Sequence, residues 1–309
     1  MGREKSPDGH PVPIAQPHGR FDPRRLCSGF GDNDEVTDMR RSGSILYAGC
    51  RMLAVSLAAL LTWPNLAHAS SADRCLAVAG LSRLVVPVAL KKSEVRLTFV
   101  GHATFLIESA GGIRIATDYN DYVKPAVLPD IATMNRAHSS HFTDAPEPGI
   151  RHVLRGWGTT NGAAVTHDLE LGDVRVRNVV TNIRDHAGGT QLFANSIFIF
   201  EIAGLCIAHL GHLHHTLTLQ QLSQLGQMDV VLVPVDGSYT MDIDGMVEVL
   251  KAIKAPLMIP MHYFSSYTLE RFLTRVRDSF EIEHPTVAST VISRATLPQS
   301  QKVLVLPGR

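Results

Sequence analysis

Histidines gather in short stretches that each follow a predicted strand. The chain has 15 histidines. Those at strand ends are His138 and His141 (after residues 130–135), His186 (after 179–185), His212 (after 205–211) and His262 (after 257–261). Imidazole is the commonest transition-metal ligand near neutral pH, and clusters of it with a carboxylate suit zinc, iron or manganese. Because strand ends on one edge of a sheet converge, we predict a metal site, although a lone histidine is more often a hydrogen-bonded polar residue.

The loop RAHSSHFTDA, residues 136–145, offers a carboxylate beside two of these histidines. His138 and His141 are three residues apart, and Asp144 follows three residues later. We expect both histidines to bind metal and Asp144 to act as a ligand or as the catalytic base; the alternative is a polar surface loop. Asp118, which follows another predicted strand, is expected to orient a ligand histidine or simply to form a turn.

Apolar patterns place these residues on an α/β scaffold. The predicted strands cover residues 94–109, 113–118, 173–183, 196–211, 230–235 and 255–263. Between the later strands, residues 216–227 and 244–255 carry leucine, valine and isoleucine at helical spacing. The pattern favours an α/β sandwich in which helices cover two sheets. Within it, His102 is expected to hold a hairpin by hydrogen bonds, and His209 to be buried and structural.

The first 69 residues differ from the rest. Residues 1–41 are polar and without periodicity, which is typical of disorder. A positive start, the apolar run Met52–Trp63 and the small residues Ala67-His68-Ala69 then form a secretory signal pattern. We expect translation to start at Met39, the leader Met39–Ala69 to be removed, and the mature protein to be periplasmic or secreted. The alternatives are a buried helix or an uncleaved anchor, and a cytoplasmic protein.

Composition limits the partners. Lysine plus arginine equals aspartate plus glutamate, at 29 each, so the chain lacks the basic field that nucleic-acid binding needs. We expect a small-molecule substrate, no nucleic acid and membrane contact only through the leader. Residues 70–93 are interpreted as a linker, and residues 94–309 as the folded domain. After cleavage, Cys75 and Cys206 would remain, either as a disulfide or, for Cys206, as an inert buried thiol.

Five segments, in this order, resemble the metallo-β-lactamase superfamily: FVGHATFLIES, GGIRIATD, FIFEIAGLCIAHLGHLHH, MDVVLVPVDG and IPMHY, within about residues 94–265. They are most similar to the branch that contains ascorbate-6-phosphate lactonase and N-acyl-phosphatidylethanolamine phospholipase D. The resemblance implies a four-layer αβ/βα sandwich. It also implies a site at the mouth between the two sheets that binds one or two metal ions.

The first metal motif departs from the family's pattern H-x-H-x-D-H. If His141 takes the second histidine, then Ser139, Thr143 and Asp144 occupy the other ligand positions, and one position of four is retained. If the loop keeps its role with a different spacing, His138 and His141 are the ligands, and Asp144 is a ligand or base.

The later motifs also match the family's pattern only in part. His262 in MHY matches the family's last histidine, and His186 lies near the third-motif histidine within a weak local match. His212 in HLGH stands where the family has an aspartate that bridges two metals. Imidazole brings no negative charge to hold two cations together, so we expect His212 to be a terminal ligand in a single-metal site or a rearranged pair.

The resemblance therefore implies a metal-dependent hydrolase, with zinc as one ion or two, and manganese or iron as alternatives. A metal-activated water would attack an ester, lactone or phosphodiester in a small substrate. One alternative is an exported binding protein that holds metal or ligand on the same fold without turnover. Another is a metal-centred oxidoreductase.

Overall fold

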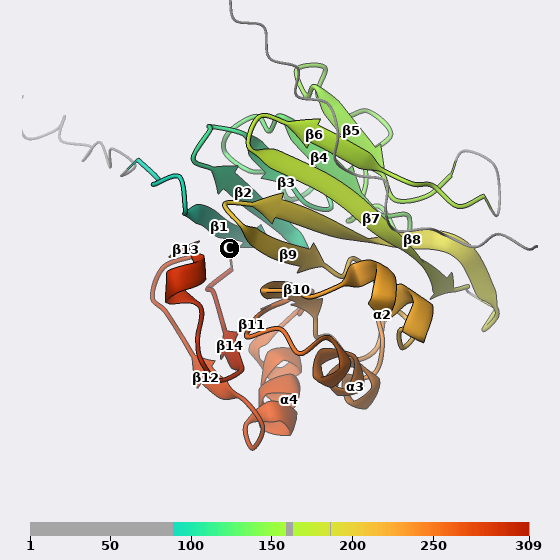
Figure 1. The fold of residues 1–309 in the computed structure, drawn as a ribbon. Coiled ribbons are helices and arrows are strands. Elements are labelled where there is room, and N and C mark those ends of the chain that lie inside the picture. The colour runs from blue at the N-terminus through green and yellow to red at the C-terminus, as the bar shows by residue number, and fades with distance from the viewer. Residues whose placement is uncertain (1–88, 159–162, 186, 309) are drawn as a thin grey trace, which may run out of the picture. The chain divides into compact units, whose positions relative to one another are not determined.

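The computed structural model describes residues 89–158, 163–185 and 187–308, and these residues form two β-sheets packed face to face (Figure 1). The six-stranded sheet contains, in spatial order, β13 (Ser289–Ile292), β1 (Val95–Gly101), β2 (Thr104–Ser109), β3 (Arg114–Ala116), β4 (Ile131–Met134) and β5 (His152–Arg155). The eight-stranded sheet contains β12 (Glu281–Glu283), β14 (Lys302–Leu304), β11 (Leu257–Met261), β10 (Val230–Pro234), β9 (Leu205–His209), β8 (Thr190–Ile202), β7 (Val174–Arg184) and β6 (Asp168–Leu171).

The two sheets bury one apolar core between them. Alternate residues of each strand face this core, as in β10, where Val230 and Leu232 point between the sheets. Val231 and Val233 point to the opposite face of the same sheet. A strand buried on both faces needs a continuous apolar run, which is why residues 230–235 could be recognised as a strand from the sequence.

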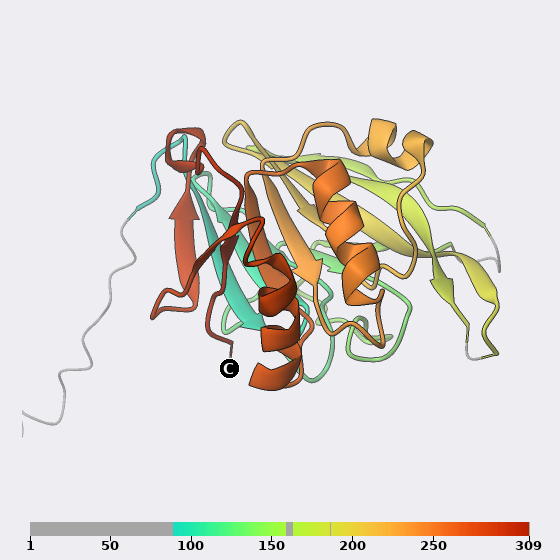
Figure 2. The same cartoon turned by 90° about the horizontal axis from the view of Figure 1, so that it is seen from below.

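Helices cover the outer face of the eight-stranded sheet (Figure 2). They are α2 (Leu219–Leu225), α3 (Ile243–Ile253) and α4 (Ser266–Val276), and η1 (Arg294–Thr296) is a short 3-10 turn. Each α-helix begins after a residue whose side chain accepts a backbone N–H of the first turn: Thr218, Asp242 and Ser265. Two of these helices were predicted, whereas α4 had no predicted counterpart.

The expected α/β sandwich of two sheets is confirmed. On the outer face of the six-stranded sheet, a small apolar cluster contains Tyr119, Met134 and Ile150. Within the described ranges no α-helix covers that face, so the second helical layer of the expected four-layer arrangement is not observed there. The predicted leader, with Cys75 and most of the linker, lies outside the described residues. None of the helices that the structure describes is long and apolar enough for a membrane span.

Parallel strands define the edge where the site lies. In one sheet β3, β4 and β5 run parallel, and in the other β9, β10, β11 and β14 do. The carboxyl ends of parallel strands lie along one edge. The segments that leave β3, β4, β9, β10 and β11 at those ends carry Asp118, His138, His141, His212, Asp236 and His262.

Candidate metal centre

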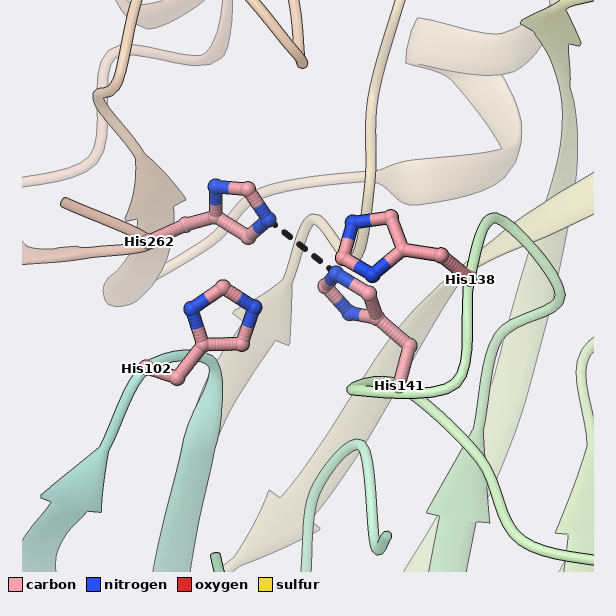
Figure 3. Close-up of side chains that lie close together, drawn as sticks. All are labelled: His102, His138, His141 and His262. Carbon is pink, nitrogen blue, oxygen red and sulfur yellow. Dashed lines mark hydrogen bonds between the residues drawn. The ribbon is translucent and has the colours of Figure 1, made fainter. Parts of the chain in front are cut away.

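Four histidines from distant segments converge at the open end of the sandwich (Figure 3). His102 lies in the β1–β2 turn, His138 and His141 in the loop after β4, and His262 directly after β11. One ring nitrogen of each lies within 4.8 Å of those of the other three. His141 and His262 are fully buried, whereas His102 and His138 are partly exposed. Such a group of nitrogen ligands is typical of a transition-metal site.

A chain of hydrogen bonds fixes the ring of His141. The backbone N–H of Ser196 donates to Oδ1 of Asn135 (2.8 Å), so the Asn135 amide donates from Nδ2 to Oδ1 of Asp118 (3.0 Å). The other carboxylate oxygen of Asp118 lies 2.6 Å from Nδ1 of His141. A carboxylate only accepts, so the His141 proton lies on Nδ1, and its Nε2 presents a lone pair to the cluster. Asp118 therefore orients a candidate ligand, the first of the two roles predicted for it.

His262 is held in the same way by a second carboxylate. Oδ1 of Asp236 lies 3.1 Å from Nδ1 of His262. Backbone N–H groups of Ser238, Tyr239 and Thr240 donate to Oδ2 of Asp236, and the Thr240 hydroxyl donates to Oδ1. Burial opposes ionisation of Asp236, but hydrogen bonds from His262, Thr240 and Ser238 outweigh it and hold the pKa of the carboxyl well below its usual range. Asp236 is thus an anion that keeps the proton of His262 on Nδ1.

The facing nitrogens of His141 and His262 test whether a metal fits. Their Nε2 atoms are 3.1 Å apart, and the two carboxylates place both protons on Nδ1. Two lone pairs therefore oppose each other, which is favourable only when they share a cation. Two nitrogens bound to one tetrahedral zinc at about 2.0–2.1 Å are roughly 3.3 Å apart. The donor set and its spacing therefore fit a zinc-like ion.

A second hydrogen-bond chain enters the cluster from β7. The backbone N–H of Arg184 donates to Nδ1 of His214 (2.6 Å), and Nε2 of His214 lies 2.6 Å from Nδ1 of His212. A neutral His214 that accepts at Nδ1 carries its proton on Nε2 and donates it. The proton of His212 then lies on Nε2, 3.0 Å from Nε2 of His138. In this arrangement His212 donates a hydrogen bond to His138.

The same chain continues to His102. Ser140 Oγ lies 2.7 Å from Nδ1 of His138 and 2.8 Å from Nε2 of His102. Because Nε2 of His138 accepts from His212, its Nδ1 donates to Ser140, and the Ser140 hydroxyl donates to His102. The loop after β4 thereby links the turn of one sheet to the histidines of the other.

Burial keeps these imidazoles neutral. Burial is the main reason that the pKa of His102 falls to about 3 and that of His214 to about 4. Burial also lowers the pKa of His138, and it places those of His141 and His212 well below the usual range. The pKa of Asp118 is raised to about 6 by burial, so the carboxyl is mostly ionised at neutral pH. Metal ligation needs neutral imidazole, and the fold provides it.

The backbone at the site adopts an unusual conformation. His102, Asp118 and His262 have φ angles of 51°, 42° and 55°. Left-handed φ in a residue other than glycine is uncommon, costs on the order of 1 kcal/mol or more, and is concentrated at functional sites. The His262 N–H donates to the His102 carbonyl (2.7 Å), which ties the two strained residues together.

Gly211, just before His212, has a structural requirement of its own. Its φ is 61°, and a Cβ there would lie 2.4 Å from the side chains of both Asn135 and Asn195. Asn195 in turn accepts the backbone N–H of His212 (2.8 Å). The glycine thus permits the close approach that positions His212.

The structure brings together most of the residues predicted for the site. His138, His141 and His262 belong to the four-histidine group, and His212 lies beside it, in contact with His138. Asp144 is exposed, and no described hydrogen bond or ion pair joins it to the cluster. Its role as ligand or base therefore stays a prediction. His186 lies outside the described residues.

Two residues of the site were not predicted. His102, assigned from the sequence to hairpin hydrogen bonds, lies in the cluster itself. Asp236 was overlooked, although it follows a buried strand as the histidines do, and that signal could have identified it. His209 is buried and donates from Nε2 to the carbonyl of Ala103 (2.8 Å), as expected for a structural residue.

We predict that Asp118→Asn weakens metal binding by about 10- to 100-fold. Because the Asn135 amide already donates to Oδ1, the new amide group would have to face Nδ1 of His141. That would move the His141 proton to Nε2 and block its lone pair. Competition with a chelator would measure the loss. Asp173→Asn, at a carboxylate bound to Ser109 and Gly111 in a distant turn, is the control, and equal metal affinity in both variants would contradict the prediction.

Comparison with known proteins agrees with this geometry. A model of the β-lactamase superfamily domain matches residues 96–262. A UPF0173 metal-dependent hydrolase of Thermoplasma volcanium is 28% identical over 196 residues, which cover 55% of this chain and 84% of that protein. Another, from Archaeoglobus fulgidus, is 28% identical over 193 residues, covering 54% and 83%.

A similar solved structure comes from Thermotoga maritima, provisionally assigned as a Zn-dependent hydrolase of the metallo-β-lactamase superfamily. Its sequence is 28% identical, the match covers 70% of this chain and 100% of that one, and the TM-score is 0.51.

Proposed function

Because the chain belongs to the metallo-β-lactamase superfamily, we propose that it is a metal-dependent hydrolase that carries zinc and cleaves an ester, lactone or phosphodiester bond in a small molecule. The observation that carries this proposal is the pair of lone pairs on His141 and His262, which face each other at 3.1 Å with a carboxylate behind each ring. The relatives named as metal-dependent hydrolases support the same activity.

The residues divide into ligands and supports. His141 and His262 would hold the metal. His102 and His138 would complete the donor set only where the metal replaces the hydrogen bonds that Ser140 and His212 donate to them. Asp118 and Asp236 keep both buried rings in the tautomer that binds metal. A cluster of imidazoles without a thiolate suits zinc, whereas manganese prefers more oxygen ligands. A divalent metal supplies Lewis acidity and makes water acidic enough to act as a nucleophile near neutral pH.

The side of the cluster that faces a cavity is where the substrate would bind. His138 and His212 line a cavity of about 790 Å³ beside the site, a size typical of pockets for small molecules. The N–H of His212 is donated to His138, so a substrate oxygen would have to replace His138 to accept it. The buried side of the cluster, at His141 and His262, has no solvent exposure, which limits competing water.

Metal analysis followed by a substrate panel tests this function. The purified protein should contain close to one equivalent of zinc, and a panel of lactones, carboxylic esters and phosphodiesters should include a substrate whose hydrolysis stops on chelation and returns with zinc. Metal at one equivalent without turnover of any class would favour a binding protein instead. A stoichiometric iron content with oxidation of a substrate would favour a metal-centred oxidoreductase.

We also propose that the protein is exported. The supporting pattern is the Arg40-Arg41 start, the apolar run and Ala67-His68-Ala69. Expression from Met39 in a Gram-negative host should yield periplasmic protein whose first residue is near Ser70, as read by mass spectrometry. Replacing Ala69 with a bulky residue, Ala69→Phe, should block processing. Recovery of uncleaved protein from the cytoplasm would contradict export.

A further inference from the structure

The cavity beside the cluster has a continuous aromatic wall. Tyr239 and Phe264 are large apolar side chains that remain 66% and 56% exposed, and both line the cavity. Their ring centroids are 5.4 Å apart in an edge-to-face arrangement. The Phe264 ring also lies 5.4 Å from that of His262 and 5.6 Å from that of His102. The wall therefore begins at the metal-binding residues and runs outward.

The lining of the cavity also includes aliphatic side chains. Ala137 and Ile183 line it from the loop after β4 and from β7. An apolar group bound in this cavity would lose much of its contact with water, which is the main source of affinity in pockets of this kind.

The charges of the cavity are balanced. Among the described residues that line it, the formal charges belong to Arg184 and Asp185, one of each sign. The Arg184 Nη2 donates to the backbone carbonyl of Ser238 (2.9 Å), and Asp185 accepts backbone N–H groups of its own turn.

The positive charge at a second depression beside the cluster is also paired. Lys124 and His102 line a smaller depression on that side. The Lys124 ammonium lies 3.4 Å from a Glu147 carboxylate oxygen and 3.8 Å from one of Asp121. The cations at the two approaches are therefore both engaged: Lys124 is paired with carboxylates, and Nη2 of Arg184 donates to the backbone carbonyls of Ser238 and Thr240, which leaves them less available to bind a phosphate group.

We propose that the aromatic cavity binds an uncharged apolar or aromatic group next to the scissile bond, so that the substrate is a neutral ester or lactone rather than a phosphodiester. This inference rests on the proposed hydrolase function. It selects the ester or lactone bond from the three kinds of bond that the function allows. Phe264 is its main specificity-determining residue, because it contacts both the site and the cavity.

Measurements of equilibrium binding test this inference without depending on catalysis. Calorimetry would compare 4-phenylbutan-2-one, a neutral ketone, with phenylphosphonate, an anion that carries the same ring, on metal-free and zinc-loaded protein. In the metal-free protein the ketone should bind at least about tenfold more tightly, and Phe264→Ala should weaken it by about tenfold. Tyr267→Ala, at a tyrosine that is 72% exposed on α4 and does not line the cavity, should change neither ligand.

A charge variant tests the balance directly. Gln191 lines the cavity and is exposed, so Gln191→Lys adds an unpaired cation without removing a contact seen in the structure. It should strengthen phenylphosphonate binding several-fold and leave the ketone unchanged. With 4-nitrophenyl hexanoate and zinc-loaded protein, Phe264→Ala should raise KM by about tenfold with little change in kcat.

The outcomes distinguish the two proposals. Selective ketone binding without ester hydrolysis would support an apolar binding cavity and count against the hydrolase function. Zinc-dependent ester hydrolysis with an unchanged KM in Phe264→Ala would support the function and overturn the inference. Phosphonate binding as tight as ketone binding in the metal-free protein would also overturn it.

Discussion

Replacing His262 with alanine is expected to reduce bound metal to well below one equivalent and to abolish measurable hydrolysis. The variant removes one of the two facing nitrogens, and it leaves the Asp236 carboxylate buried without its histidine partner. The loss of affinity should exceed the 10- to 100-fold typical of residues that only support a ligand, so a decrease of about 1,000-fold or more is expected. His141→Ala should have the same effect, because Nε2 of His141 is the other of the two facing nitrogens.

Two measurements make this prediction decisive. Metal content after dialysis and circular dichroism should show loss of metal with retained secondary structure. His284→Ala, at an exposed histidine outside the four-histidine group, is the matched control and should keep its metal. Full occupancy in His262→Ala would mean that the metal lies elsewhere. So would separation of the His141 and His262 imidazoles by more than about 8 Å in an experimental structure, given zinc–nitrogen distances near 2 Å.

The metal-free protein should lose stability steeply as pH falls from about 6.5 towards 4. Burial lowers the pKa of five histidines at the site: His102, to about 3, His214, to about 4, and His138, His141 and His212. The unfolded chain, with histidine pKa values near 6.5, therefore binds more protons than the folded chain in this range. The contribution of these histidines to the free energy of unfolding is complete above pH 6.5, and it is lost as pH falls from there towards the folded pKa values.

The expected slope follows from the most buried pair. His141 and His212 are 0% and 3% exposed, and two extra protons on the unfolded chain correspond to about 2.7 kcal/mol per pH unit. Asp118 acts in the opposite direction between about pH 4 and 6, because its raised pKa favours the protonated folded state, but it is one group against five.

Thermal melts of chelated protein at several pH values would measure this effect. For a domain of this size the melting temperature should fall by about 5–10 °C per pH unit, and zinc should shift the decline to lower pH because it competes with protons for the same nitrogens. A constant melting temperature between pH 7 and 5 would show that the histidines are not buried in the neutral form.

The sequence predicted the scaffold better than the contacts within the site. Buried strands such as residues 230–235 and 257–261 show as apolar runs, and the histidines after them could be identified by position. The pairs Asp118–His141 and Asp236–His262 could not be identified, because they join separate strand ends whose register the sequence does not state. His102 was assigned to the hairpin because it occupies a tight turn. The predicted branch of the superfamily stays a prediction.

The origin of the four histidines has a mechanical consequence. His102, His138 and His141 extend from the six-stranded sheet, and His262 extends from the eight-stranded sheet, 121 residues from His141 in sequence. An ion bound by both groups would cross-link the two sheets at the open end of the sandwich. Its removal should release that end first, so amide hydrogens near Asn135 and Asp236 should exchange faster in chelated protein, while those of β10 remain protected.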